Sequence, residues 1–313
     1  MPTEDDGPGN PGEPEDRAET AGAGRIVLVG TPIGNLGDLS PRAVRVLAAA
    51  DVIACEDTRV TRKLLTHAGI TGRRLVALHA HNEASAAAAL VSEASAGAVV
   101  AVVTDAGMPG ISDPGARLVA AAAATGVEVE VVPGPSAALA ALVVSGLPTD
   151  RFSFDGFLPR KGGERAARLA AIAAEPRTVV LFESPHRVRV TVGNLLSSCG
   201  ADRSVAIARE LTKRHQEVWR GSLGEAGTWL ETVAPRGEYV IVVGPARPPD
   251  PAGAATAVDD DAITSALVSR LAAGDDRKAA VAGVAASLGV PRRRVYDVAV
   301  ALKKARGQQE AAR

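Results

Sequence analysis

Short hydrophobic runs recur along the chain and are separated by longer, alanine-rich segments. Between residues 25 and 133 the runs are rich in β-branched residues, and they predict strands at 26–29, 52–55, 75–78, 99–103 and 127–132. The segments between them are long enough to form helices. This β-α-β rhythm predicts a mostly parallel sheet that is covered by helices on both faces.

A second set of hydrophobic runs predicts another α/β domain, with strands at 152–157, 178–182, 205–208 and 239–243. The end of the chain shows only helical patterns, and its apolar spacing fits a helix-turn-helix. We therefore expect a disordered acidic tail, two α/β domains, a linker and a helical, helix-turn-helix-like unit, at residues 1–24, 25–134, 135–246, 247–258 and 259–306.

Four predicted helices begin with a capping residue followed by proline, a combination typical of helix N-termini. They start at Ser40-Pro41, Asp113-Pro114, Gly134-Pro135 and Ser184-Pro185. Each follows a predicted strand, so the helix N-termini would gather on one rim of the fold and favour an anionic group there. The alternative is that these are only good helix starts.

Composition limits the classes of protein that fit. The chain has 313 residues, 46% of them hydrophobic, and a net charge of −1, so its overall charge does not indicate nucleic-acid binding. Charge is nevertheless uneven, with seven acidic residues and one basic residue in 1–20 and six basic residues against one acidic residue in 292–306. Two cysteines provide neither a disulfide framework nor a metal-ligand set, which favours the reducing cytoplasm. We expect no signal peptide, no membrane span and no metal site.

Two glycine-rich loops indicate a ligand site. Gly30, Gly34 and Gly37 follow the first strand with the spacing G-x-x-x-G-x-x-G, which is neither the dinucleotide fingerprint nor the P-loop. Pro32 removes one backbone donor from the same loop, so the ligand is expected not to be a pyrophosphate. The densest loop is 104–115, with three glycines, two prolines and two aspartates after a buried strand.

Six ordered motifs carry a family resemblance: VGTPIGNLGDLSPRA, CEDTR, TDAGMPGISDPG, PGPSA, FESPHR and ARELTK. Together they closely resemble the 16S ribosomal RNA cytidine-2′-O-methyltransferases, which are tetrapyrrole-methylase-like, class III S-adenosylmethionine-dependent methyltransferases. The resemblance spans residue 25 to about residue 244. It implies two α/β domains with S-adenosylmethionine in the cleft between them. It also implies methylation of cytidine 1402 by a homodimer that acts on the small ribosomal subunit.

The resemblance also implies a set of cofactor-binding residues, carried over from the motifs and from the start of the last strand. They are Gly30, Thr31, Pro32, Gly34, Asp105, Ala106, Gly107, Met108, Pro109, Ser112, Pro133, Gly134, Pro135, Ser136, Ala137, Gly237, Glu238 and Tyr239.

Methyl transfer to a hydroxyl needs positioning and a route for the hydroxyl proton. The catalytic candidates are Glu183, His186 and Arg187. Histidine titrates near neutral pH, which makes His186 the obvious base, and Glu183 is the alternative if it is buried. The competing interpretation is that His186 caps a helix and Glu183 pairs with Arg187.

Basic residues on the second domain and the terminal unit are candidates for contacting RNA. The substrate-binding candidates are Asp57, Arg59, Arg160, Lys161, Arg209, Lys213, Arg292, Arg293 and Arg294. Alternatively, Asp57 and Arg59 pair with each other, the loop at 157–163 is only solvated, and the terminal unit is a plain helical hairpin with a basic face.

Two other functions compete with the rRNA 2′-O-methyltransferase. The same fold would suit methylation of a tetrapyrrole, and a DNA-binding regulator would use the terminal helix-turn-helix with the α/β body as a ligand sensor. The basic loop and terminal unit favour RNA, so we expect a cytoplasmic enzyme that engages neither DNA nor a membrane.

Overall fold

A computed structural model of the chain describes residues 24–246 and 259–311, of which the last nine are described as backbone only. The expected tail, apart from Gly24, and the expected linker at 247–258 lie outside the described residues. The chain divides into two compact units after Pro245, and each is described by itself. No described helix has the length and apolar character needed to cross a membrane.

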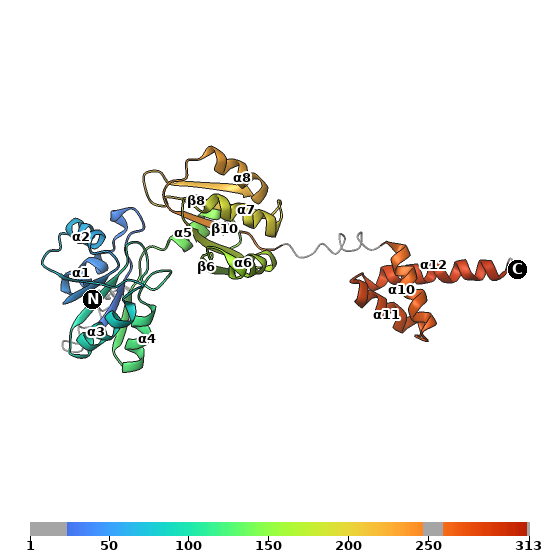
Figure 1. Cartoon of the computed structure of the whole chain (residues 1–313), viewed down its shortest axis with the longest axis horizontal. Helices are drawn as coiled ribbons and strands as arrows, with labels where there is room; N and C mark the ends of the chain where they lie inside the picture. Colours follow the sequence, from blue (N-terminus) through green and yellow to red (C-terminus); the bar gives the residue numbers. More distant parts are fainter. Residues whose placement is uncertain (1–23, 247–258, 312–313) are drawn as a thin grey trace, which may run out of the picture. The chain divides into compact units, whose positions relative to one another are not determined.

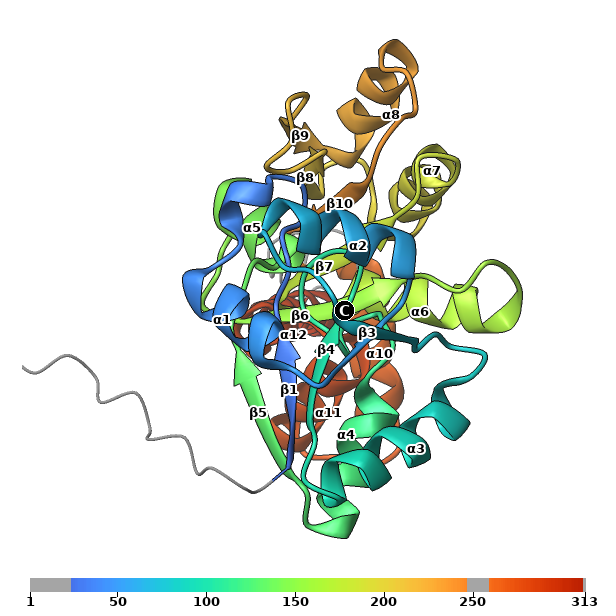
Figure 2. The same cartoon turned by 90° about the vertical axis from the view of Figure 1, so that its left-hand side faces the viewer.

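The first sheet has five parallel strands in the order β3-β2-β4-β1-β5. Figure 2 shows β5, β1 and β4 side by side. The bounds lie within one residue of the predicted strands: β1 (Arg25–Val29), β2 (Val52–Cys55), β3 (Arg74–Ala77), β4 (Val99–Val103) and β5 (Glu128–Val132). The prediction of a parallel sheet is confirmed.

Helices cover both faces of this sheet, as the rhythm predicts. Along β1, Val27 packs with helices α1 and α2, whereas Ile26 packs with α3 and α4, because successive side chains of a strand point to opposite faces. The helices surround the sheet in Figure 1. Their bounds are α1 (Pro41–Ala49), α2 (Thr58–His67), α3 (Glu83–Ser95) and α4 (Ala116–Thr125), with a short 3-10 helix η1 (Leu36–Asp38) before α1.

The second sheet is mixed, with the order β6-β7-β10-β8-β9. β6 and β7 are parallel, and the other neighbours are antiparallel. The strands are β6 (Phe152–Phe157), β7 (Thr178–Glu183), β8 (Ser204–Arg209), β9 (Glu217–Ser222) and β10 (Tyr239–Val243). The sequence prediction missed β9, whose residues are polar or small apart from a valine and a tryptophan and give a weak hydrophobic signal.

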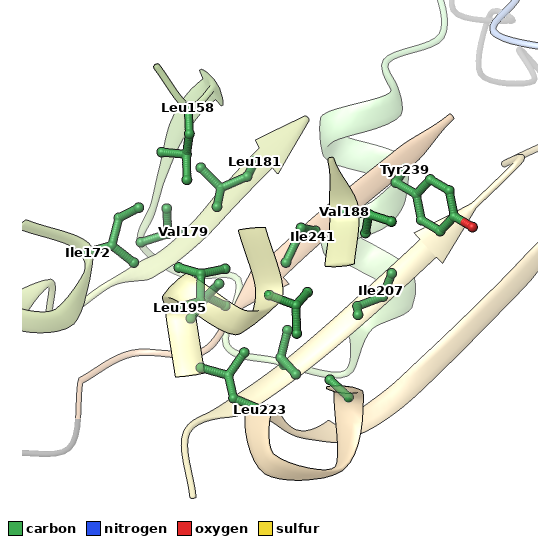
Figure 3. Close-up of a cluster of buried hydrophobic side chains, with 14 of the residues drawn as sticks. Leu158, Ile172, Val179, Leu181, Val188, Leu195, Ile207, Leu223, Tyr239 and Ile241 are labelled. Atoms are coloured by element: carbon green, nitrogen blue, oxygen red, sulfur yellow. The ribbon is translucent and has the colours of Figure 1, made fainter. Parts of the chain in front are cut away.

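One face of the second sheet carries α6 (Gly162–Ala174), α7 (Val188–Cys199) and α8 (Leu223–Thr232). Their side chains enclose the cluster drawn in Figure 3, which includes Leu181 and Ile241. The opposite face packs against α5 (Ala137–Ser145). Ile33, from the loop after β1, is buried in the hydrophobic cluster on this opposite face, with α5. It thereby packs the first domain against the second.

Only one of the four predicted helix starts is correct. Ser40 caps α1 with Pro41 at its first position. The N-cap of α4 is Gly115, and that of α5 is Ser136. The N-cap of α7 is Arg187, after a turn. At these three sites the helix begins two or three residues after the predicted proline, at Ala116, Ala137 and Val188.

The C-terminal unit is all helical, as predicted. It consists of α10 (Asp260–Ala272), α11 (Arg277–Leu288) and α12 (Arg292–Ala311) around a core of its own. Gly289 ends α11 in the left-handed conformation, with φ of 64°, which a glycine adopts without strain. A short turn that begins at Gly289 joins α11 to α12, which gives the order helix, turn, helix that the sequence predicts.

Candidate functional site

The loops after β1 and β4 meet at the carboxyl ends of these neighbouring strands. Strand order reverses beside β1, the position where ligands bind in open α/β sheets. Thr31 joins the two loops: its backbone N–H donates to Gly107 O at 2.9 Å, and its hydroxyl donates to Thr104 O at 3.1 Å. A backbone and a side-chain hydrogen bond of Thr31 therefore hold the two loops together.

A cavity of about 400 Å³ lies here and is lined by residues of both α/β domains. Half of the residues expected to bind a cofactor line it: Asp105, Ala106, Gly107, Met108, Ser112, Ser136, Ala137, Glu238 and Tyr239. The other half are not among its lining residues: Gly30, Thr31, Pro32, Gly34, Pro109, Pro133, Gly134, Pro135 and Gly237.

The glycines of the first loop serve close packing of the chain. A Cβ added at Gly30 would lie 2.6 Å from the Cα of Gly134, and one added at Gly34 would overlap the side chain of Lys213. Asn35 N donates to the Thr212 hydroxyl at 3.1 Å, which docks the same loop on the second domain. Contacts between loops thus explain Gly30 and Gly34, whereas a Cβ at Gly37 would meet only Asn35 of its own loop.

All the charged side chains in the cavity lining are carboxylates. Glu56, Asp105, Asp113, Glu183 and Glu238 all line it, and its described lining includes no lysine, arginine or histidine. Glu183 and Glu238 form ion pairs with Arg187 and Lys213, whereas no ion pair is found for Glu56, Asp105 and Asp113 among the described residues. These three acids favour a positively charged group of a ligand over an anionic one.

Three of these acids have raised pKa values. Burial raises the pKa of Glu56, and the nearby charge of Asp113 adds to this effect. Burial also raises the pKa of Asp105, followed by repulsion from Glu56, and burial raises that of Asp113. A cationic ligand would relieve this repulsion between like charges.

Sequence reasoning missed Glu56 and Asp113 as lining residues. Both lie in motifs that it quoted, and Glu56 directly follows strand β2. The available signal was position, because carboxylates at the carboxyl ends of neighbouring parallel strands gather at one edge.

Glu183 and Arg187 hold the turn after β7. The Glu183 side chain is fully enclosed and accepts hydrogen bonds from Ser184 N at 2.8 Å and from the Thr191 hydroxyl at 2.6 Å. Arg187 lies 3.4 Å from the same carboxylate and donates to Leu158 O at 2.7 Å. The pairing offered as the alternative for these two residues is therefore present, while His186 is exposed and outside the cavity lining.

Most substrate-binding candidates form ion pairs within the chain. Asp57 pairs with Arg59 at 2.6 Å, and hydrogen bonds from Arg59 lower the pKa of Asp57 to about 2. The others are Arg209 with Glu217 at 2.9 Å, Lys213 with Glu210 at 2.8 Å and with Glu238 at 3.0 Å, and Arg294 with Asp260 at 2.9 Å. Arg160, Lys161, Arg292 and Arg293 are exposed.

Comparison with known proteins decides the family. The model of the tetrapyrrole (corrin/porphyrin) methylases matches residues 25–227. The ribosomal RNA small subunit methyltransferase I of Synechocystis sp. is 42% identical over 280 residues, which cover 90% of this chain and 99% of that protein. The protein of the same name from Mycobacterium tuberculosis is 45% identical and covers 91% of this chain and 98% of its own length. This chain belongs to the ribosomal RNA small subunit methyltransferase I family.

A solved structure supports the same fold for this family member. The uroporphyrin-III C-methyltransferase of Thermus thermophilus, crystallised with S-adenosylhomocysteine, is 24% identical with a TM-score of 0.51. The match covers 71% of this chain and 97% of that structure. Among the residues described here, no group of three or more histidine, cysteine, aspartate or glutamate side chains is placed to hold a metal ion.

Proposed function

We propose that this chain is an S-adenosylmethionine-dependent methyltransferase that methylates the 2′-hydroxyl of cytidine 1402 in 16S ribosomal RNA. The names of its family relatives and the six ordered motifs support small-subunit rRNA as the substrate. The carboxylate-lined cavity at the rim of the first sheet is the structural observation that carries the proposal.

The residues present fit S-adenosylmethionine. Its sulfonium and ammonium groups are cations, and the cavity lining offers Glu56, Asp105 and Asp113, which form no ion pair among the described residues. Its volume of about 400 Å³ lies within the range of small-molecule sites. When bound, S-adenosylmethionine supplies a methyl group on positively charged sulfur. Asp105, Gly107, Met108, Ser112 and Glu238 would hold it.

The chain has two tasks in the transfer: it must position the acceptor and remove its proton. The O–H bond of the ribose breaks as the O–CH3 bond forms, so the proton needs an acceptor. We propose His186, which is exposed on the turn directly after the cavity residues Ser184 and Pro185. Glu183 and Arg187 then act by fixing that turn.

Exposed basic residues are the groups that we propose contact the RNA. Arg160 and Lys161 follow strand β6, and Arg292 and Arg293 open α12 in the C-terminal unit. Their ammonium and guanidinium groups would contact phosphates of the ribosomal RNA.

We also propose that the chain forms a homodimer and acts in the cytoplasm, where ribosomal subunits are the substrate. Leu139 and Val143 lie one turn apart on α5 and are 51% and 73% exposed. We propose that this exposed apolar pair lies in the interface between the two copies.

Methyl transfer from labelled S-adenosylmethionine tests the function. Small ribosomal subunits, free 16S rRNA and uroporphyrinogen are offered in parallel, and RNA products are mapped to the nucleotide. We expect a single 2′-O-methyl mark on cytidine 1402. Transfer only to uroporphyrinogen would contradict the assignment of rRNA as the substrate. We do not expect this result, because uroporphyrinogen carries several carboxylates and the charged residues of the cavity lining are acidic. No transfer to any of the three would overturn the activity.

A further inference from the structure

Phe157 lies at the end of β6, lines the cavity and is nevertheless 53% exposed. The ring of Phe182 supports it in a T-shaped contact, with centroids 5.7 Å apart, and Phe154 contacts Phe182 at 4.9 Å. An edge-to-face contact leaves part of a ring available. The cavity therefore has a fixed aromatic surface at its mouth.

A β-bulge aims Phe157 at the cavity. Phe154 pairs with Val180, and Gly156 pairs with the next residue, Leu181, so one extra residue enters β6. Phe157 consequently pairs with Phe182. Without the bulge it would pair with Glu183 and point to the opposite face of the sheet, because side chains alternate along a strand. Gly156, with φ of 59°, allows this kink.

The charge of the cavity dictates how a nucleotide can enter. Its carboxylates without an ion pair, Glu56, Asp105 and Asp113, repel phosphates. Phosphates are favoured outside the cavity, where Arg160 and Lys161 are exposed on the loop that follows Phe157. The ribose must still reach the cavity. An uncharged group suits the attached base at the mouth. The exposed, uncharged lining residues are Phe157, Ile111 and Ser112, and of these Phe157 alone is aromatic.

We propose that Phe157 is the platform on which the base of the target nucleotide stacks when its ribose enters the cavity. This rests on the proposed function. Single-stranded, unstacked bases are commonly held on aromatic side chains in RNA-binding proteins. The other large aromatic rings of the α/β domains are engaged or distant: Trp219 stacks on Trp229 at 5.3 Å, Tyr239 is 2% exposed, and Phe152 lies at the other end of β6.

Two substitutions and one control test the platform. Phe157→Leu keeps an apolar side chain but removes the aromatic face, and Phe157→Trp keeps the face. Phe152→Leu is the matched control, because Phe152 is on the same strand, is 37% exposed and does not line the cavity. For each variant, calorimetry gives the Kd for S-adenosylmethionine, and initial rates against subunit concentration give kcat/KM for the small subunit.

We expect Phe157→Leu to lower kcat/KM for the subunit by about tenfold or more, with an unchanged Kd for S-adenosylmethionine. Phe157→Trp and Phe152→Leu should behave as the wild type. A Phe157→Leu variant with wild-type kcat/KM overturns the proposal, as does one that loses affinity for S-adenosylmethionine, since the ring would then belong to the cofactor. Equal losses in Phe157→Leu and Phe157→Trp also overturn it, because they indicate a packing role. If the wild type itself leaves the subunit unmethylated, the proposed function has failed, and this inference fails with it.

Discussion

Asp113 is a cavity residue that we expect to lower the stability of the free protein while it favours ligand binding. It lies near Asp105, and burial raises its pKa. Its folded-state pKa therefore exceeds the unfolded value, and the folded protein binds a proton more readily than the unfolded chain. Ionised Asp113 lowers the free energy of unfolding at neutral pH. This cost begins to fall as the pH drops below the raised pKa, and it is gone below the pKa of the unfolded chain.

Asp113→Asn should accordingly raise the melting temperature of the free protein at pH 7, with a gain that shrinks towards pH 4. It should also weaken the binding of S-adenosylmethionine. Glu175→Gln is the control of opposite sign, because hydrogen bonds from Arg177 lower the pKa of Glu175 and its ionised form is stabilising. Thermal unfolding at the two pH values measures both; a lower melting temperature for Asp113→Asn at pH 7 would contradict the argument.

Helix α4 depends on an acid from another helix. Its N-cap, Gly115, has no side chain to cap the first turn. Glu83, at the start of α3, accepts hydrogen bonds from Gly115 N at 2.9 Å and Arg117 N at 3.1 Å. The end of the cavity loop at 104–115 is thereby fixed from outside its own segment.

Glu83→Ala should lower the free energy of unfolding by about 1–2 kcal/mol, because it leaves two backbone donors without an acceptor. Since the cavity loop leads directly into α4, affinity for S-adenosylmethionine should fall as well. Ser222→Ala is the matched control: it removes the cap of α8, which follows no cavity loop, and should cost similar stability at unchanged affinity. Denaturant unfolding and calorimetry measure the two quantities. If Glu83→Ala binds S-adenosylmethionine as tightly as Ser222→Ala does, the hydrogen bonds of Glu83 to α4 have no effect on the cavity.

Apart from β9, the strands could be predicted from the sequence with bounds that differ little from those of the structure, because buried β-branched runs are a local signal. The cavity could be predicted only in part. Asp105 and Met108 were found by motif, whereas the packing role of Gly34 depends on Lys213, far along the chain. The cap of α4 by Glu83 and the re-aiming of Phe157 by a bulge depend likewise on partners that no local pattern reveals.

At the scale of the whole molecule, the C-terminal unit has a core of its own and carries exposed cations. Ile263, Leu267 and Val284 are buried in that core, and Arg292 and Arg293 are exposed at the start of α12. Substitutions at these exposed positions should therefore leave the core of this unit intact.

Arg292→Ala with Arg293→Ala should weaken binding to the small ribosomal subunit several-fold and reduce the dependence of binding on salt, because two phosphate contacts are lost. Affinity for S-adenosylmethionine should not change. Arg42→Ala with Arg45→Ala removes the same charge from exposed positions of α1 and serves as the control. Binding measured across a range of salt concentrations tests this; the same loss in both double variants would assign the effect to net charge alone.

The contact between Gly30 and Gly134 also limits how this protein can change by mutation. Each α-carbon occupies the space that a side chain on the other would need, within 2.7 Å. Glycine is already the smallest residue, so no second substitution at either position can make room for a first at the other. Residues around the two glycines can therefore vary, but Gly30 and Gly134 themselves cannot be replaced, singly or together, while the two loops keep this contact.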